Sequence, residues 1–172
     1  MSRARAAELL RRYLPDLVYG ANDGAITTFA VVTGVTGAAL SERIILILGF
    51  ANLVADGFSM GASNFLSRRS HAEAEDRAGV PEAIRHAAGT LLGFVTAGLV
   101  PLLAYLLPVP DDTRFPLAVV LTLATLYAVG ASRAWVTRLG FFRSGLEMLL
   151  VGALAAVVAY GIGAVAAALT GG

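Results

Sequence analysis

Long apolar runs, separated by short charged or proline-containing segments, dominate the pattern of the chain. Five of these runs have about the length that an α-helix needs to cross the roughly 30 Å hydrocarbon core of a bilayer. We predict spans at about residues 17–39, 44–66, 86–108, 115–133 and 145–169. The pattern therefore predicts an all-α polytopic membrane protein with five transmembrane helices, forming a single domain over residues 1–172.

Arginines are distributed unevenly among the connections between these runs. They cluster in the lead-in 1–16, in the loop 67–85 and between the fourth and fifth runs. The other two connections carry only Arg43 and Arg114. Because short arginine-rich loops stay in the cytoplasm, we expect a cytoplasmic N-terminus, a short cytoplasmic loop at 67–85 and a C-terminus outside.

The first two predicted spans carry acids, which are rare at bilayer depth. Asp23 follows Asn22 in the first span, and Asp56 lies in the second. A charged side chain there costs about 2.5–3.5 kcal/mol on insertion scales and usually faces a partner or a wet cavity. Four side chains of the second span recur at every fourth residue: Asn52, Asp56, Met60 and Asn64. This spacing places them on one stripe of a helix, which does not suit a surface that faces lipid.

Small residues accompany these polar positions. The glycines are Gly20, Gly24, Gly34 and Gly37 in the first span, and Gly57 and Gly61, a GxxxG pair, in the second. Small residues allow helix backbones to approach closely in lipid. We therefore expect the first two spans to pack against each other and to bring Asp23, Asp56 and Met60 within reach of a common ligand.

Carboxylates, amide oxygens and one thioether form a mixed set of metal ligands. Carboxylates, carbonyls and water suit Mg²⁺, Ca²⁺ or Mn²⁺, and a methionine sulfur favours a first-row transition ion such as Fe²⁺ or Mn²⁺. The same spacing fits a second interpretation, in which Met60 is ordinary packing and the asparagines hold helices together. In that case the aspartates pair with arginines, and the protein is a membrane assembly module that transports nothing.

The composition narrows the class of protein further. Hydrophobic residues make up 57% of the chain and charged residues 15%, with a mean hydropathy of +0.74, whereas a soluble domain has about 25% charged residues. The absence of cysteine excludes disulfides and thiolate metal sites. The net charge of +1 indicates no particular partner. We expect no nucleic-acid partner and no permanently bound cofactor.

One short motif suggests a different activity. GFSMG at 57–61 matches the G-x-S-x-G nucleophile elbow, but in a hydrolase that serine lies on a strand-to-helix turn. Here Ser59 falls inside a helical run, and the two histidines, His71 and His86, lie in or at the end of the cytoplasmic loop. We therefore do not expect an enzyme.

The cytoplasmic loop itself has two interpretations. Its acids and histidines, within SRRSHAEAEDRAGVPEAIRH (67–86), could collect a cation before it enters the membrane. Such a run is also typical of a solvated helix end with intrahelical pairs such as Glu73–Arg77, four residues apart. The second interpretation is the one we favour.

Several segments resemble the vacuolar iron transporter family. GANDGAITTFAVVTGVTGA (20–38) resembles its first-span signature, and DGFSMGASNFLS (56–67) resembles its second-span segment. Residues 87–108 and 145–163 resemble its third and fifth spans. The likeness therefore covers nearly the whole chain, in the right order.

The resemblance implies a homodimeric carrier in a bacterial plasma membrane that moves Fe²⁺ or Mn²⁺ out of the cytosol in exchange for protons. It implies that Asp23 and Met60 contact the metal and that the pore lies between the first two spans at the dimer axis. The full set of candidate metal ligands is Asp23, Met60, Asp56, Asn22 and Asn64. Glu147 is a candidate proton relay, or else an interfacial anchor paired with Arg143.

The chain departs from the family pattern at two places. Many members have glycine–glutamate where this chain has Ser63–Asn64, so one carboxylate of the expected path is absent. The glutamate-rich metal-binding domain between the second and third spans is reduced to about twenty residues. The chain thus resembles short members that lack this domain.

Overall fold

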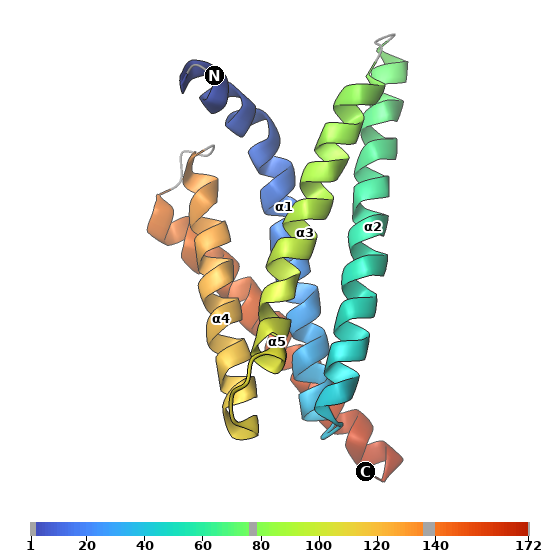
Figure 1. Cartoon of the computed structure of the whole chain (residues 1–172), viewed down its shortest axis with the longest axis vertical. Helices are drawn as coiled ribbons and strands as arrows, with labels where there is room; N and C mark the ends of the chain where they lie inside the picture. The colour runs from blue at the N-terminus through green and yellow to red at the C-terminus, as the bar shows by residue number, and fades with distance from the viewer. Residues whose placement is uncertain (1–2, 76–78, 136–139, 172) are drawn as a thin grey trace.

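The computed structural model describes residues 3–75, 79–135 and 140–171, and these residues are helical almost throughout. Its helices are α1 (Arg3–Gly37), α2 (Glu42–Ala74), α3 (Val80–Leu106), α4 (Asp111–Ser132), the short 3₁₀ helix η1 (Arg133–Trp135) and α5 (Phe141–Thr170). The five long helices run alternately up and down, so the two chain termini lie at opposite ends of the bundle (Figure 1). Each predicted span coincides almost completely with one of them.

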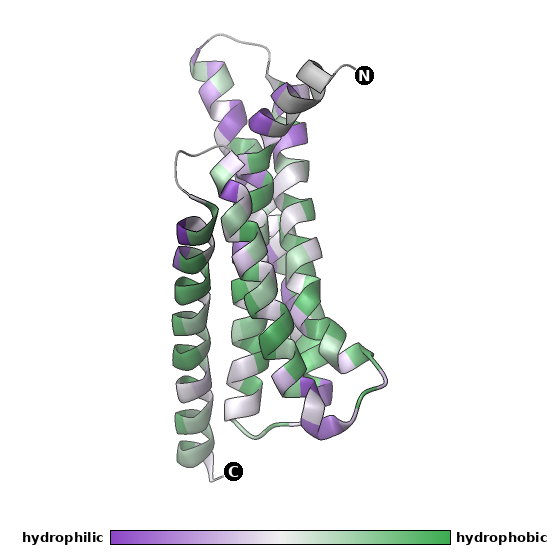
Figure 2. Cartoon of the chain, turned by 90° about the vertical axis from the view of Figure 1, so that its left-hand side faces the viewer, coloured by the Kyte–Doolittle hydropathy of each residue, from purple (hydrophilic) through white to green (hydrophobic). Residues whose placement is uncertain are grey.

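Four of these helices are long and apolar enough to cross a membrane: α2, α3, α4 with η1, and α5. Among the described helices of this length, α1 alone does not qualify, because Asn22, Asp23 and a series of threonines interrupt its apolar sequence. Figure 2 shows hydrophobic residues along most of the helix lengths and hydrophilic ones gathered toward the ends. Because α1 contacts each of the other four long helices, protein rather than lipid covers much of its surface.

Two groups of buried side chains form the core. The larger joins the first four helices and includes Phe29, Val32, Ile45, Leu53, Phe94, Leu102 and Ala118. The smaller consists of Ala25, Ala97, Leu126 and Met148. Helices α1, α3 and α4 contribute to both groups. Because α1 and α3 contact each other most extensively, they form the central pair of the bundle.

Glycines make the closest helix contacts, although not between α1 and α2. Gly20 and Gly24 lie so near the backbone of α3 that an added Cβ at either would overlap a carbonyl oxygen, and Gly37 faces the backbone of α5 in the same way. The GxxxG pair of α2, Gly57 and Gly61, faces α3. The prediction that glycines pack the first two spans together is therefore wrong. Small residues gather where backbones cross, and α1 crosses α3 and α5 most closely.

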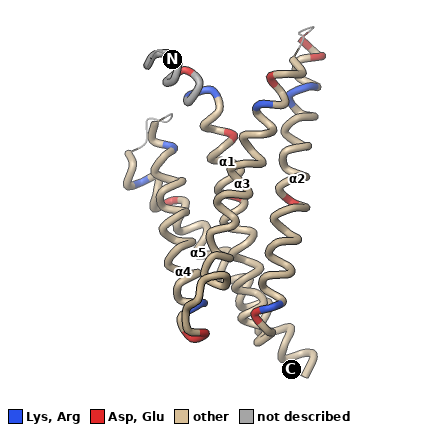
Figure 3. Tube along the Cα trace, in the orientation of Figure 1, with Lys and Arg blue, Asp and Glu red and all other residues tan. Residues whose placement is uncertain are grey.

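Most of the charged residues lie toward the two ends of the bundle, and ion pairs join helices there (Figure 3). At the end that holds the N-terminus, Arg12 pairs with Glu82 and links α1 to α3. At the opposite end, Arg114 pairs with Glu42 of α2 and, at 2.9 Å, with Asp111 of its own helix. The membrane-length helices between these ends carry few charges, so the acids that do occur there stand out.

The two segments predicted to lie outside the membrane are largely helical. Helix α1 begins at Arg3, within the lead-in 1–16, and α2 and α3 together cover most of the loop 67–85. Within α2, Arg69 donates a hydrogen bond to Glu73 at 2.7 Å, one turn away. This pair is of the kind expected for a solvated helix end, whereas the predicted partner Arg77 lies outside the described residues.

Candidate functional site

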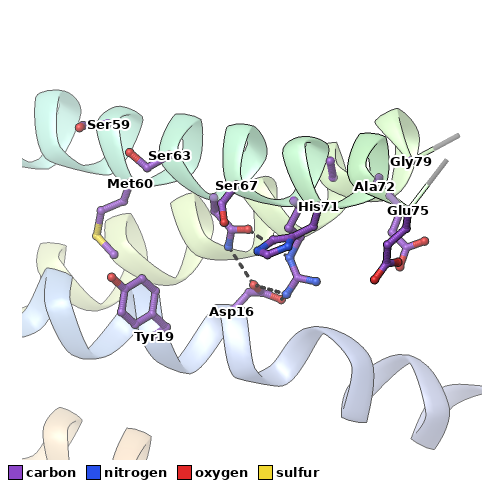
Figure 4. Close-up of a pocket in the computed structure, with 14 residues that line it drawn as sticks. Asp16, Tyr19, Ser59, Met60, Ser63, Ser67, His71, Ala72, Glu75 and Gly79 are labelled. Atoms are coloured by element: carbon purple, nitrogen blue, oxygen red, sulfur yellow. Dashed lines mark hydrogen bonds and ion pairs between the residues drawn. The ribbon is translucent and has the colours of Figure 1, made fainter. Parts of the chain in front are cut away.

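A groove of about 840 Å³ lies on the face of the bundle where α1, α2 and the start of α3 meet. Toward one end of it, Tyr19 of α1 lies opposite Met60 of α2, and Glu75 lies toward the other end (Figure 4). The wall between them is mostly polar: Asp16, Ser63, Asn64, Ser67, Arg68 and His71. The groove therefore leads from the N-terminal end of the bundle toward the predicted metal-contacting methionine.

The predicted four-residue stripe is present on α2, which is helical throughout this region. Met60 and Asn64 line the groove, and Asn52 and Asp56 continue the stripe toward the middle of the bundle. Asp56 is exposed, whereas Asn52, Met60 and Asn64 are half-buried. Half of the stripe thus borders the groove, while Asn52 and Asp56 lie beyond its lining.

Asp23 is half-buried on α1, and its backbone carbonyl accepts a hydrogen bond from the Thr27 hydroxyl at 2.8 Å. Its carboxylate lies close enough to that of Asp56 for the two negative charges to repel each other. In the described part of the chain, neither carboxylate forms an ion pair with an arginine. The arginine pairing required by the assembly-module interpretation is therefore not found for these two aspartates.

The acid that does pair with an arginine inside the bundle is Asp16, whose side chain is only 6% exposed. Its Oδ1 accepts hydrogen bonds from Asn64 Nδ2 at 2.8 Å and from Arg68 Nη2 at 3.1 Å. Its Oδ2 lies 2.5 Å from Nδ1 of His86. Asp16 therefore ties α1 to both α2 and α3 at the wall of the groove. Figure 4 shows the link to α2.

The surroundings of Asp16 favour its ionised form. Burial by itself would raise the pKa of this carboxyl, but the hydrogen bonds with His86 and Asn64 and the charge of Arg68 outweigh burial and hold the pKa below its usual value. A buried carboxylate is tolerated when charged and hydrogen-bonding groups satisfy it in this way. Asp16 lies in the predicted lead-in 1–16 and is not among the site residues predicted from sequence.

Asn64 takes part in the same cluster. Besides its bond to Asp16, Nδ2 donates to the Thr90 hydroxyl at 2.6 Å, and Oδ1 accepts from Arg68 Nε at 3.2 Å. The amide thus joins α2 to α1 and α3. Its oxygen, the atom that would ligate a metal, faces a guanidinium group.

The structure separates Asn22 from the other candidate ligands. Asn22 lines a second cavity of about 490 Å³, bordered by Leu14, Val18, Arg133 and Met148. Its Oδ1 is buried and has no hydrogen-bond partner among the described residues. Although it is adjacent to Asp23 in sequence, Asn22 borders a different cavity from Met60.

Glu147 lies near the start of α5 and accepts a hydrogen bond from Arg143 at 3.2 Å, one helical turn away. The pair is partly exposed to solvent. This is the contact that the anchor interpretation requires, and the role of Glu147 as a proton relay remains a prediction.

The serine motif has no catalytic setting. GFSMG lies in the middle of α2 instead of on a strand-to-helix turn, and Ser59 is exposed. Of the two histidines, His86 is committed to Asp16 through Nδ1. The geometry of a nucleophile elbow is therefore absent from this segment.

Within the described ranges, no group of three or more acidic, histidine or cysteine side chains lies close enough together to hold a metal ion. The predicted ligands near the middle of the bundle amount to two carboxylates and one thioether from α1 and α2. First-row divalent ions take more ligands than these three groups provide. If these residues bind a metal, one chain would provide only part of its coordination shell.

The sequence profile of the VIT family matches residues 14–80 and 74–164, which together cover most of the chain. Among curated relatives, vacuolar iron transporter homolog 1 of Arabidopsis thaliana is 27% identical over 176 residues, covering 94% of this chain and 88% of the relative. Vacuolar iron transporter homolog 1 of Oryza sativa subsp. japonica is 28% identical over 168 residues, covering 88% of this chain and 72% of the relative.

A longer relative aligns as well. Vacuolar iron transporter 1 of Eucalyptus grandis is 24% identical over 218 residues, covering 91% of this chain and 86% of the relative. That alignment is longer than the 172 residues of this chain, so the relative carries additional residues within the matched region. The profile, the relatives and the apolar helices agree that this chain is a multi-pass integral membrane protein of the VIT family, a family of transporters and not of enzymes.

Proposed function

We propose that this protein exports a divalent transition metal, Fe²⁺ or Mn²⁺, from the cytosol. Family membership and the names of the relatives support the transport of a metal ion. The observation that carries the proposal is the state of Asp23, a half-buried carboxylate among membrane-length helices that, like Asp56, has no arginine partner in the described residues. Acids at this depth usually face a cation, a partner or water.

A divalent cation between these two carboxylates would remove their repulsion. The thioether of Met60 lies one helical turn after Asp56 on α2, and sulfur favours first-row transition ions over Mg²⁺ or Ca²⁺. Two carboxylates with one soft donor therefore support Fe²⁺ or Mn²⁺ as the transported substrate.

We infer that a second copy of the chain covers the groove face and completes the site. Asp56, Ser59 and Ser63 are exposed on α2 although this helix is long and apolar enough to span a membrane. Lipid does not solvate such groups, so this face needs water or protein. A second copy there would supply further ligands and would place the pathway at the dimer axis.

The proposed topology has five spans in a bacterial plasma membrane: the four helices that are apolar enough, and α1 in addition. The N-terminus is cytoplasmic and the C-terminus lies outside. The α2–α3 and α4–α5 connections lie at the end that holds the N-terminus, as an alternating path requires (Figure 1). The arginine-rich segments belong to this end, and such segments stay in the cytoplasm. The groove would then open toward the cytosol.

Proton antiport would follow from competition for the same oxygens. A metal ligand must be deprotonated, so metal binding releases protons and protonation releases the metal. Protons entering from the outer side would expel the metal there. Glu147 remains the candidate way-station for them.

The test is uptake into proteoliposomes of Fe²⁺, Mn²⁺, Co²⁺ and Zn²⁺ under an imposed pH gradient. We expect Fe²⁺ or Mn²⁺ uptake by the wild type and uptake at the level of empty vesicles for Asp23→Asn. Asp112→Asn is the matched control, because it removes an acid that is exposed at the opposite end of the bundle. Wild-type uptake by Asp23→Asn would remove Asp23 from the mechanism, and no uptake of any metal would favour the assembly module.

A further inference from the structure

A cation that enters the groove from the N-terminal end meets the positive charge of Arg68 before it reaches Met60. Arg68 lines the groove, and its side chain is 42% exposed. A guanidinium keeps its charge at all physiological pH values. The pathway therefore contains a group that repels its own proposed substrate unless that group is neutralised or moves.

The guanidinium is bound at two side-chain oxygens. Arg68 Nη2 lies 3.1 Å from Asp16 Oδ1, and Nε lies 3.2 Å from Asn64 Oδ1. A carboxylate oxygen and an amide oxygen are also suitable ligands for a hard or borderline divalent ion. Arg68 thus stands where a metal ion would find two protein ligands.

The contacts of Asp16 favour the replacement of Arg68 by another cation over the departure of Arg68 alone. Asp16 is nearly fully buried, whereas Arg68 reaches solvent. If Arg68 left, Asp16 would be a buried charge that lacks its arginine, which is strongly unfavourable. Departure of Arg68 is therefore coupled to the arrival of another cation at Asp16.

A second observation concerns His86, which lies behind the wall of the groove and has a buried nitrogen without a hydrogen-bond partner within the described ranges. The side chain of His86 is 3% exposed; Nδ1 contacts Asp16, and Nε2 is buried with no hydrogen-bond partner in the described residues. This Nε2 lies 3.7 Å from the carboxylate of Glu82, which lines the same groove. A water molecule carried by a metal ion is the kind of group that would satisfy it.

We propose that Asp16 and Asn64 form an entry site for a divalent cation, and that Arg68 occupies this site as a tethered cation until a metal ion displaces it. The proposal rests on the proposed transport function, which supplies the cation. His86 is a positioning residue that holds one carboxylate oxygen of Asp16 and leaves the other toward the groove. Because the protein supplies two ligands and water the rest, binding is weak and reversible, as an entry site requires.

The test measures Mn²⁺ binding to the purified full-length protein, from the loss of the free-ion electron paramagnetic resonance signal. All variants carry Asp23→Asn, so that the proposed inner site does not contribute. Adding Arg68→Gln removes the competing charge, and we expect a tighter Mn²⁺ Kd by about tenfold, equivalent to about 1.4 kcal/mol. Arg69→Gln is the matched control, because this neighbouring arginine pairs with Glu73 and does not line the groove. It should leave the Kd unchanged.

Adding Asp16→Asn to the Arg68→Gln protein should abolish the gain in Mn²⁺ affinity. An unchanged Kd for Arg68→Gln, or a gain that survives Asp16→Asn, overturns the proposal. If Arg68→Gln does not fold, Arg68→Lys replaces it, because lysine keeps the charge but loses the forked contact of the guanidinium. A smaller gain in Mn²⁺ affinity is then expected, and no gain would again refute the proposal. This experiment measures binding alone. The entry site can therefore be refuted while the uptake assay still supports transport, and the reverse result is equally possible.

Discussion

Asp16 and Asp23 lie two turns apart on the same helix, and their surroundings are opposite. The carboxylate of Asp16 is 6% exposed and is bound by side chains from α2 and α3. Asp23 is half-buried, lies close to another acid and has no arginine partner in the described residues. Two identical side chains, seven residues apart, therefore face opposite electrostatic environments.

Under the proposed function, this difference separates an acid that holds helices together from one that would be available to a substrate. Asp16 in its present state is satisfied by the protein, and its removal would leave His86, Asn64 and Arg68 without a common acceptor. Asp23 has no such partner among the described residues, and acids at this depth usually face a cation, a partner or water. The following predictions test whether the two acids divide their roles in this way.

The largest expected effect is on stability, from Asp16→Ala. Loss of the acceptor should lower the free energy of unfolding by about 3 kcal/mol, at the low end for a buried pair because Arg68 can turn to solvent. Asp23→Ala should change it by less than about 1 kcal/mol. Chemical unfolding of both variants in the same detergent measures the difference. Equal losses would mean that Asp23 is as structural as Asp16 and that the comparison fails.

A smaller effect is expected from pH. Because the folded protein lowers the pKa of Asp16, its contribution to stability is complete above about pH 4, the ordinary value for an aspartate, and is lost as the pH falls toward the lowered pKa. The wild type should therefore have a higher Tm than Asp16→Asn near neutral pH. This gap should narrow as the pH falls below about 4. A gap that stays constant or widens on acidification would show that ionised Asp16 does not stabilise the fold.

The smallest effect is expected at Met60, beside the unpaired acids. Met60→Leu conserves volume and should leave the Tm nearly unchanged, while the ratio of Fe²⁺ to Mn²⁺ uptake in proteoliposomes falls a few-fold because the soft donor is lost. Met148→Leu is the control, since this methionine packs in the small core and borders the other cavity. The same ratio in both variants would show that the sulfur of Met60 is only packing.

The positions of the helices could be predicted from sequence because they depend on local information. An apolar run of sufficient length has few alternatives to a helix in a membrane, and the recurrence of Asn52, Asp56, Met60 and Asn64 places them on one stripe in any α-helix. Both features are present in the structure. The glycines also indicated where helices approach each other closely. The sequence could not predict which helix each glycine contacts, because a small residue permits a close approach by any helix.

The pairing of the acids was decided only by the tertiary structure. The three partners of Asp16 lie 48, 52 and 70 residues away in sequence, so no local pattern connects them. The available signal was that Asp16 lies two helical turns before Asp23, hence near the same face, and that His86 begins the third predicted span. Sequence determined that carboxylates enter the bundle. The packing of α2 and α3 around α1 determined which carboxylate is neutralised and which remains open, because electrostatic pairing depends on distance in space.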